Sequence, residues 1–341
     1  MGLEITMLPE LNLPVLNAHK LKSQDLITLI QDHHPELTQR VLNHGALLFR
    51  GFNCISVQMF SDAITACNLG SRCDTQDYDL PRTILSDDIY TSSDLPGHIP
   101  LPLHHEKPRS INPPHHLYFC CAQPPEQKGG TLLANAASIW DAMPRDISRR
   151  IDAYGVIYKQ FFHGNTWLAN WLKKNLGEGS ARRWQEYFGT QNRAEVENKL
   201  AAGLAQWKWI DKKDDLIVTQ SLPGVLEHPE NGNKCWFNSA AYLNYFDNLI
   251  YGSLSALHGL SYVAARYMMF QDIFPLVCHY GNGESFSKKD ILRINEILQN
   301  HIKVMRWQAG DFMIVDNYTM MHGKQPHEGQ RLLYSCMTER L

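Results

Sequence analysis

The stretch Leu117-Tyr118-Phe119-Cys120-Cys121 is apolar and aromatic without regular alternation, which is typical of a β-strand buried on both faces. Residues 46–50 and 131–134 are similar short runs before and after it. Two further strands are predicted near the C-terminus, over 311–316 and 331–337. Strands from both ends of the chain are thus separated by largely helical sequence. This order favours a mainly β fold with helical insertions (α+β), built as an antiparallel barrel or jelly roll, over a parallel α/β sheet.

The middle of the chain predicts helices and hairpins. Spacing, caps and turn residues indicate a helix starting at 138, helices over 165–176, 195–204, 248–259 and 288–302, a hairpin over 206–219 and a hairpin turn at 230–233. Three earlier helices are predicted over 23–31, 35–43 and 56–70. We therefore expect a single domain over 1–341, with core strands from about 45–135 and 305–341 and a helix and hairpin insertion at about 140–300.

The composition excludes several classes of protein. With 341 residues, 44% hydrophobic and 20% charged, the chain can build a sizeable core, and wholesale disorder is excluded. A net charge of -3 argues against a nucleic-acid or membrane-surface binder. The N-terminus does not resemble a signal peptide, and no run approaches the roughly 20 apolar residues of a membrane span. The 8 cysteines, without a CxxC pair, are interpreted as reduced core residues of a cytoplasmic protein.

Histidine is over-represented, at 16 residues, which raises the question of a metal. Residues 102–106 read Pro-Leu-His-His-Glu and look extended. In such a segment His104 and Glu106 point to one side and His105 to the other. With His322 near the C-terminus they could form the two-His, one-carboxylate triad of non-haem Fe(II) oxygenases. An H-x-E pattern also arises by chance at strand edges, and a zinc hydrolase could use the same ligands, although the H-E-x-x-H helix is absent.

Arg331 follows His322 by nine residues, in a predicted strand. A guanidinium that points into a barrel beside a metal needs an anion, because a buried unpaired charge is costly. A dicarboxylate chelated to iron would supply that anion, and Thr131 could add a hydroxyl to the same carboxylate. Taken singly, Arg331 also fits a surface ion pair, and Thr131 fits an ordinary strand residue.

The chain resembles the Fe(II)/2-oxoglutarate-dependent oxygenases of the taurine dioxygenase-like (TauD/TfdA) superfamily. It is most similar to the branch with clavaminate synthase and the syringomycin-pathway aspartyl hydroxylase, which carries H-x-E in place of H-x-D. The similar blocks occur in the family's order over about 45–341. These blocks are Gly45-Ala46-Leu47-Leu48-Phe49-Arg50-Gly51-Phe52, Tyr90-Thr91-Ser92, Ile99-Pro100-Leu101-Pro102-Leu103-His104-His105-Glu106, Phe119-Cys120 with Pro124, Gly129-Gly130-Thr131, Cys235-Trp236-Phe237-Asn238, Gly310-Asp311-Phe312, Asp316-Asn317, His322-Gly323 and Arg331.

The resemblance implies a double-stranded β-helix (jelly-roll) core, Fe(II) as the metal, 2-oxoglutarate as cosubstrate and O2 as oxidant. It implies His104, Glu106 and His322 as the iron ligands of the catalytic centre. It further implies that Arg331 holds the distal carboxylate of 2-oxoglutarate, with Thr131 as its partner.

The residues next to these positions depart from the family. His105 stands where the branch usually has Asn, and Lys107-Pro108-Arg109 replaces a small or aromatic run. Ser335 replaces the second arginine that taurine dioxygenase uses for its sulfonate, so taurine is a poor substrate prediction. Lys107 or Arg109 could receive a carboxylate or a phosphopantetheine phosphate at the mouth of the site, or both could be solvated loop cations. Ser335 would leave room for a substrate side chain.

We therefore predict a 2-oxoglutarate-dependent dioxygenase that oxidises an unactivated C–H bond, by default through hydroxylation. The predicted substrate is an amino acid or a carrier-protein-tethered aminoacyl group in natural-product biosynthesis. Alternatives are desaturation or cyclisation of another small molecule, or a non-catalytic carrier-protein-binding relative. Glu106 argues against halogenation, because halogenases leave that position open for chloride. No nucleic-acid or membrane partner is expected, and the exact substrate and the oligomeric state, including a homo-oligomer, stay open.

Several smaller signals are interpreted as structural. His115-His116 is expected to have a structural role rather than a metal. Trp167 and Trp171, one helical turn apart, are expected in core or lid packing. Asn317 and residues 236–238 could either orient the ligands or form turns.

Overall fold

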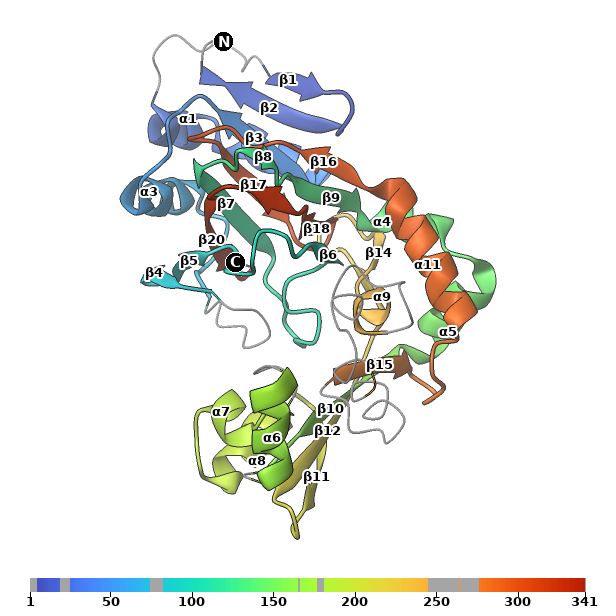
Figure 1. Cartoon of the computed structure of the whole chain (residues 1–341). Helices are drawn as coiled ribbons and strands as arrows, with labels where there is room; N and C mark the ends of the chain where they lie inside the picture. The colour runs from blue at the N-terminus through green and yellow to red at the C-terminus, as the bar shows by residue number, and fades with distance from the viewer. Residues whose placement is uncertain are drawn as a thin grey trace.

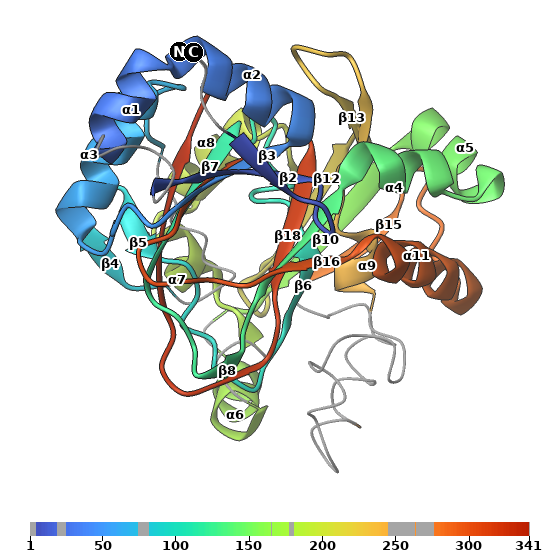
Figure 2. The same ribbon diagram turned by 90° about the horizontal axis from the view of Figure 1, so that it is seen from above.

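The computed structural model describes residues 5–18, 25–73, 82–164, 166–176, 181–244, 263 and 276–340. Two β-sheets form a jelly roll in the upper part of Figure 1, and a second group of helices and strands extends below it. Seen from above in Figure 2, α1 to α3 lie on one side of the jelly roll, and α4, α5 and α11 lie on the opposite side. The predicted strand-rich fold with helical insertions is confirmed.

The larger sheet contains the buried strand at 117–121. Its eight strands run in the order β1-β2-β3-β17-β7-β20-β5-β4. They are β1 (Ile5–Leu8), β2 (Leu13–Asn17), β3 (Ala46–Arg50), β4 (Ile84–Ser86), β5 (Ile89–Thr91), β7 (His116–Gln123), β17 (Phe312–Asp316) and β20 (Leu332–Thr338). All neighbouring pairs are antiparallel except β2 and β3. Strand β7 is thus flanked on both sides by strands from the end of the chain.

The smaller sheet faces the larger one. Its antiparallel strands run in the order β16-β9-β18-β6. They are β6 (Leu101–His104), β9 (Thr131–Asn135), β16 (Lys303–Met305) and β18 (Met320–Lys324), and a short pair, β8 (Gln127–Lys128) with β19 (His327–Glu328), lies beside them in the chain. One buried apolar cluster joins the two sheets, with Leu48, Phe119 and Met313 from the larger sheet and Leu133 and Met320 from the smaller.

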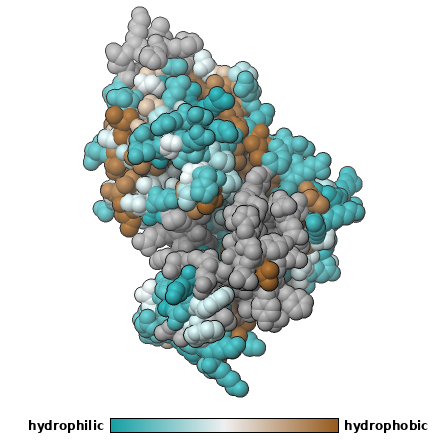
Figure 3. Space-filling view, viewed as in Figure 1, coloured by the Kyte–Doolittle hydropathy of each residue, from teal (hydrophilic) through white to brown (hydrophobic). Residues whose placement is uncertain are grey.

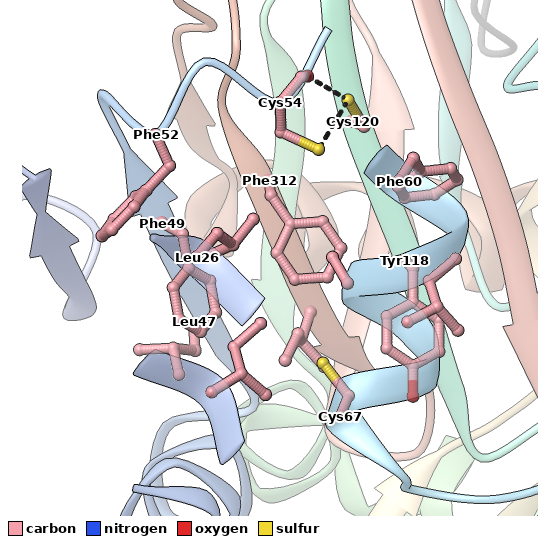
Figure 4. Close-up of a cluster of buried hydrophobic side chains, with 14 of the residues drawn as sticks. Leu26, Leu47, Phe49, Phe52, Cys54, Phe60, Cys67, Tyr118, Cys120 and Phe312 are labelled. Atoms are coloured by element: carbon pink, nitrogen blue, oxygen red, sulfur yellow. Dashed lines mark hydrogen bonds between the residues drawn. The ribbon is translucent and has the colours of Figure 1, made fainter. Parts of the chain in front are cut away.

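Helices cover the outer face of the larger sheet. They are α1 (Leu26–Asp32), α2 (His34–His44) and α3 (Val57–Cys67). Figure 4 shows Leu26 and Phe60 from these helices against Tyr118 and Phe312 from the strands, all buried. Because both faces of β7 are covered, its side chains are apolar on both faces, as predicted. The predicted helix end is also confirmed, since Gly45 closes α2 with a left-handed φ of 75°.

The insertion has its own four-stranded antiparallel sheet, in the order β11-β12-β10-β15. The strands are β10 (Val156–Phe162), β11 (Gln206–Ile210), β12 (Asp215–Leu222) and β15 (Leu276–Tyr280), and the hairpin of β13 (Val225–Glu227) and β14 (Lys234–Trp236) follows β12. The helices are α4 (Ala136–Ala142), α5 (Arg145–Tyr154), α6 (Trp167–Leu176), α7 (Trp184–Phe188), α8 (Arg193–Ala202), α9 (Ala240–Leu243) and α11 (Lys288–His301). Both predicted hairpins are confirmed.

The insertion and the jelly roll share a core. One cluster of buried side chains joins Leu103 and Leu132 of the smaller sheet to Tyr158 and Cys278 of the insertion's sheet. Apolar contact between two units couples their unfolding, and for this reason we propose that they form the single domain expected from the sequence.

Several expectations need correction. Strands β1 and β2 extend the larger sheet before residue 45, where no strand was predicted. Helix α4 begins after Asn135, whose side chain accepts the N–H of Ser138, so the predicted cap at 138 is wrong. Trp167 and Trp171 are 77% and 41% exposed, so they are not core residues. The predicted helix over 248–259 lies outside the described residues.

The surface is mainly hydrophilic in the view of Figure 3, with apolar residues in small groups. Among the described residues, no helix has both the length and the apolar character that crossing a bilayer requires. Seven of the 8 cysteines are buried thiols without a disulfide, in agreement with the predicted core role, and Cys73 is partly exposed.

Candidate active site

The histidines of the predicted triad come together on the smaller sheet. His104 ends β6, and His322 lies directly opposite it in the antiparallel pairing with β18. His322 lies in the middle of β18. Directly opposed residues share a face of the sheet and approach closely. Accordingly, the two imidazole centroids are 4.3 Å apart.

Glu106 is held by Asn317, a fully buried residue directly after β17. The side-chain Oδ1 of Asn317 accepts the backbone N–H of Glu106 at 2.9 Å. Its Nδ2 donates to the carbonyl oxygens of Glu106, at 3.1 Å, and of Pro114, at 2.9 Å. Asn317 therefore orients a predicted ligand, which is one of the two roles expected for it.

The three side chains present their ligand atoms to one point. Glu106 Oε1 lies 3.4 Å from His322 Nε2 and 4.0 Å from His104 Nε2. His104 Nδ1 donates to the carbonyl of Pro102 at 2.8 Å, so Nε2 keeps a lone pair, and this buried nitrogen has no hydrogen-bond partner among the described residues. A buried lone pair that faces a carboxylate is unfavourable unless a cation lies between them. The donor set and the unpartnered Nε2 therefore fit a divalent metal such as Fe(II).

The charges at this point also suit a metal. Burial and the neighbouring His322 lower the pKa of His104 to about 3, so its imidazole is neutral at pH 7. Burial alone would raise the pKa of Glu106, but Arg82 and His322 hold that pKa well below its usual range, so the carboxylate is ionised. A neutral imidazole and an ionised carboxylate are the protonation states that metal binding needs.

Arg82, which the sequence analysis did not identify, contacts the same carboxylate. Its Nη2 donates to Glu106 Oε1 at 2.6 Å, and both side chains are 5% exposed. Arg82 precedes β4 and belongs to no motif that could have marked it. It is the counter-ion of Glu106 inside the protein.

His105 points away from the triad, as the predicted alternation requires. Its two ring nitrogens lie 2.6 Å and 2.7 Å from the backbone carbonyl oxygens of Asn317 and Trp236. Its ring stacks on Phe237 with centroids 4.2 Å apart. His105 thus ties the strand end to the insertion, and its position agrees with the predicted H-x-E register.

The two residues predicted to bind the cosubstrate lie beside the triad. Thr131 of β9 and Arg331 line one cavity together with the triad. Trp307 Nε1 donates to Thr131 Oγ1 at 2.9 Å, which leaves the hydroxyl proton able to donate to an anion. The Nε of Arg331 donates to the carbonyl of Gly129 at 3.2 Å. Burial lowers the pKa of Arg331 to about 10, so its guanidinium is still charged at pH 7.

Lys324, also missed by the sequence analysis, lines the same cavity. It ends β18, two residues after His322, and is 3% exposed. Burial and the charge of Arg331 lower the pKa of Lys324 to about 8. The cavity therefore holds more positive charge than the sequence analysis predicted.

A larger cavity of about 300 Å³ opens on the other side of the triad, toward the insertion. Lys107 and Arg109 line this cavity, which agrees with the alternative that they receive an anionic group of the substrate. The insertion contributes aromatic and polar side chains: Gln160, Tyr187, Phe188, Lys199, Gln220 and Tyr242. Gln160 is 9% exposed, and its amide nitrogen has no hydrogen-bond partner among the described residues. This cavity can therefore receive a polar, anionic molecule next to the triad.

Ser335 does not line either of these two cavities. Its hydroxyl donates to the carbonyl oxygens of Tyr90 and Thr91, at 3.4 Å and 3.3 Å, between β20 and β5. The prediction that it makes room for a substrate side chain is therefore wrong, because the hydroxyl is used within the larger sheet.

Residues 10–337 match the sequence profile described as Taurine catabolism dioxygenase TauD, TfdA family. The chain belongs to the TauD/TfdA family. This TauD/TfdA protein is therefore a 2-oxoglutarate-dependent dioxygenase, an oxidoreductase that uses Fe(II), 2-oxoglutarate and O2. The family resemblance inferred from the sequence blocks is confirmed.

Two relatives of this TauD/TfdA protein align over most of its length. It is 26% identical over 299 residues to the dapdiamide synthesis protein DdaC of Enterobacter agglomerans, and the alignment covers 88% of this chain and 83% of DdaC. It is 24% identical over 307 residues to a clavaminate synthase-like protein of Arabidopsis thaliana, and the alignment covers 86% of this chain and 81% of that protein.

Solved structures share the fold of the TauD/TfdA chain. AAD-2 in complex with Mn(II) and N-oxalylglycine superposes with a TM-score of 0.51 at 13% identity, covering 100% of this chain and 98% of AAD-2. A candidate alpha-ketoglutarate-dependent taurine dioxygenase from Burkholderia xenovorans gives a TM-score of 0.53 at 13% identity, covering 100% and 93%. The predicted jelly-roll fold is confirmed.

A second histidine cluster lies in the larger sheet, where the end of β17 pairs with the start of β7. The ligand atoms of His115, His116 and Asp316 lie within 4.8 Å of one another. However, the rings of His115 and His116 stack nearly parallel, at 8° and 4.4 Å. Stacked parallel rings cannot both direct a nitrogen lone pair in their own planes at one ion. His228 Nε2 donates to Asp316 at 2.7 Å, because its Nδ1 accepts the N–H groups of Glu230 and Asn231. This arrangement favours the structural role expected for the histidine pair.

Proposed function

We propose that this dioxygenase oxidises an unactivated C–H bond of an amino acid or of an aminoacyl group tethered to a carrier protein, by default through hydroxylation. The observation that carries the proposal is the cavity of about 300 Å³, which is lined by His104 and Glu106 of the triad together with Lys107 and Arg109. Two cations at the mouth of the cavity suit a substrate carboxylate or a phosphopantetheine phosphate. The name of the relative DdaC, a dapdiamide synthesis protein, agrees with a role in natural-product biosynthesis.

In this proposal His104, Glu106 and His322 hold Fe(II), and Arg331 with Thr131 holds the distal carboxylate of 2-oxoglutarate. When bound, the metal and its cosubstrate supply the oxidation, in which R–H, O2 and 2-oxoglutarate give R–OH, succinate and CO2.

The protein's own part is binding and orientation. Asn317 fixes the backbone on both sides of the Glu106 peptide, so the carboxylate is held in place before the metal arrives. Phe119 and Tyr242 pack beside the histidines, with ring centroids 5.5 Å from His322 and 6.3 Å from His104 respectively. The amide nitrogen of Gln160 can donate to a polar group of the substrate.

The metal assignment is tested by substitution. His104→Ala, Glu106→Ala and His322→Ala should each abolish turnover and Mn(II) binding measured by calorimetry, with the fold retained by circular dichroism. His105→Ala is the control, because His105 points away from the triad. Loss of Mn(II) binding in His105→Ala equal to that in His104→Ala would show that the H-x-E register is wrong.

The substrate assignment is tested by product mass. Free amino acids and aminoacyl carrier proteins are offered side by side with Fe(II), 2-oxoglutarate and O2. A gain of one oxygen or a loss of two hydrogens on an aminoacyl species supports the proposal. Lys107→Ala and Arg109→Ala should then raise KM more than they lower kcat. Turnover only with a sulfonate, a fatty acid or a nucleobase would refute the substrate class and leave the metal assignment unaffected.

A further inference from the structure

Lys324 is a buried cation with weak partners. Its Nζ donates to the carbonyl oxygens of Leu95 and Pro96, and both distances are 3.4 Å, at the long end for a hydrogen bond. Within the part of the chain that the structure describes, no carboxylate oxygen lies within 4.0 Å of this ammonium. A buried charge without a counter-ion is expensive, so the fold keeps Lys324 here at a cost in stability.

The strand pairing directs Lys324 toward the predicted cosubstrate residues. Lys324 is directly opposite Thr131 in the antiparallel pairing of β18 with β9. Directly opposed side chains lie on one face of a sheet, with Cβ atoms about 5 Å apart. Lys324, Thr131 and Arg331 also line a single cavity with the triad. Three groups able to donate hydrogen bonds to an anion thus converge on one place.

The charges in this cavity do not balance. Among the described residues that line the cavity, Glu106 is the one carboxylate, and it already has Arg82 as a counter-ion. The hydrogen-bond acceptors of Arg331 are the carbonyl of Gly129 and the hydroxyl of Ser92, neither of them an anion. Among the described residues, the half-buried Arg331 and the buried Lys324 are therefore left for a ligand, and a metal would add two more charges. A dicarboxylate is the class of ligand whose charge and hydrogen-bond acceptors match this surplus.

We propose that Lys324 is a binding residue for 2-oxoglutarate, whose ammonium shares the distal carboxylate with the guanidinium of Arg331 and the hydroxyl of Thr131. This inference rests on the proposed function, in which the distal carboxylate binds at Arg331. Arg331 supplies a planar fork and Lys324 supplies a compact point charge, so the two cations can contact different lone pairs of one carboxylate.

A purely structural role for Lys324 would consist of its hydrogen bonds to Leu95 and Pro96. Lys324→Gln separates the two roles, because its amide can still donate to these carbonyls but carries no charge. Lys324→Met removes both the charge and the donors. Lys303→Met is the matched control, since Lys303 is an exposed lysine in the same sheet.

The experiment compares two ligands of the Mn(II)-loaded protein by calorimetry without turnover. The ligands are 2-oxoglutarate and 2-oxopentanoate, which replaces the distal carboxylate with a methyl group. Lys324→Gln and Lys324→Met should each weaken 2-oxoglutarate binding by at least about tenfold. Both should leave the affinities for 2-oxopentanoate and for Mn(II) within about twofold of wild type. Lys303→Met should change none of these values.

An unchanged preference for 2-oxoglutarate over 2-oxopentanoate in Lys324→Gln would overturn the proposal, whether or not Lys324→Met folds. Equal weakening of both ligands would also overturn it, because that pattern indicates loss of structure. The same titrations of wild-type protein and of Arg331→Ala test the proposed function separately from the role of Lys324. If wild type binds no Mn(II), or if Arg331→Ala keeps the full preference for 2-oxoglutarate, the site assignment fails before Lys324 is considered.

Discussion

Replacing Asn317 with alanine should damage the metal site through a residue that does not touch the metal. Its side chain satisfies one backbone N–H and two backbone carbonyls, all buried, at Glu106 and Pro114. Leaving a buried backbone group without a partner costs about 1–3 kcal/mol. The two carbonyls keep a second lone pair and fall at the low end of this range, so Asn317→Ala should lose roughly 3 kcal/mol of unfolding free energy. Release of Glu106 should also weaken Mn(II) binding by about 10- to 100-fold.

The assay pairs urea unfolding with calorimetric Mn(II) titration of the folded protein. Asn238→Ala is the matched control, since Asn238 is also buried and bonds two backbone groups, at Gly224 and Ala240. It makes no hydrogen bond to the triad, so Asn238→Ala should lose stability and keep wild-type Mn(II) affinity. Asn317→Ala with wild-type Mn(II) affinity would refute the reasoning, because the ligand would then be positioned without this clamp.

Three further predictions concern stability and metal binding. Arg82→Met should destabilise the metal-free protein by about 3–5 kcal/mol, because it leaves Glu106 as a buried unpaired charge. In calorimetry, Mn(II) should then raise the Tm of Arg82→Met more than the Tm of wild type, and equal rises would contradict this. Asp316→Asn should cost about 2 kcal/mol in urea unfolding by weakening the charged hydrogen bond from His228. Burial would raise the pKa of Asp316, but its histidine neighbours hold that pKa below its usual range. The stabilisation from the ionised carboxylate is therefore complete above about pH 4 and is lost as the pH falls. A stability difference between Asp316→Asn and wild type that persists in acid would contradict this. Gly323→Ala would place a Cβ 2.6 Å from a carbonyl oxygen of β6. The substitution should therefore separate β18 from β6 and weaken Mn(II) binding at least about tenfold, and an unchanged Mn(II) titration would count against this.

The parts of the fold that could be predicted are those with a strong local signal. Strand β7 is apolar on both faces because both of its faces are covered, and the run of residues 117–121 shows this directly. Strands β1 and β2 were missed because they are short edge elements whose pairing depends on residues far along the chain. The insertion's sheet was recognised only as a hairpin, since β10 and β15 are far apart in sequence.

The same distinction applies to the site. His104 and Glu106 could be paired from their spacing, because alternation in an extended segment predicts a common side, although β6 ends at His104 and Asn317 holds Glu106 beyond it. Arg82 and Lys324 carry no local pattern, and tertiary folding alone brings them to the cavity. The expected role of Ser335 failed because Arg331 lies before β20 and not in it, so the two side chains do not share a strand face as predicted.

The position of β7 between β17 and β20 has a consequence for synthesis on the ribosome. Until β17 and β20 leave the exit tunnel, both edges of β7 have unpaired N–H and C=O groups, and such edges promote aggregation. His322 joins His104 across 218 positions of sequence, so the metal site closes among the last and slowest contacts to form. The triad therefore cannot assemble before β18 leaves the ribosome, and premature termination near residue 310 yields an aggregation-prone fragment without His322.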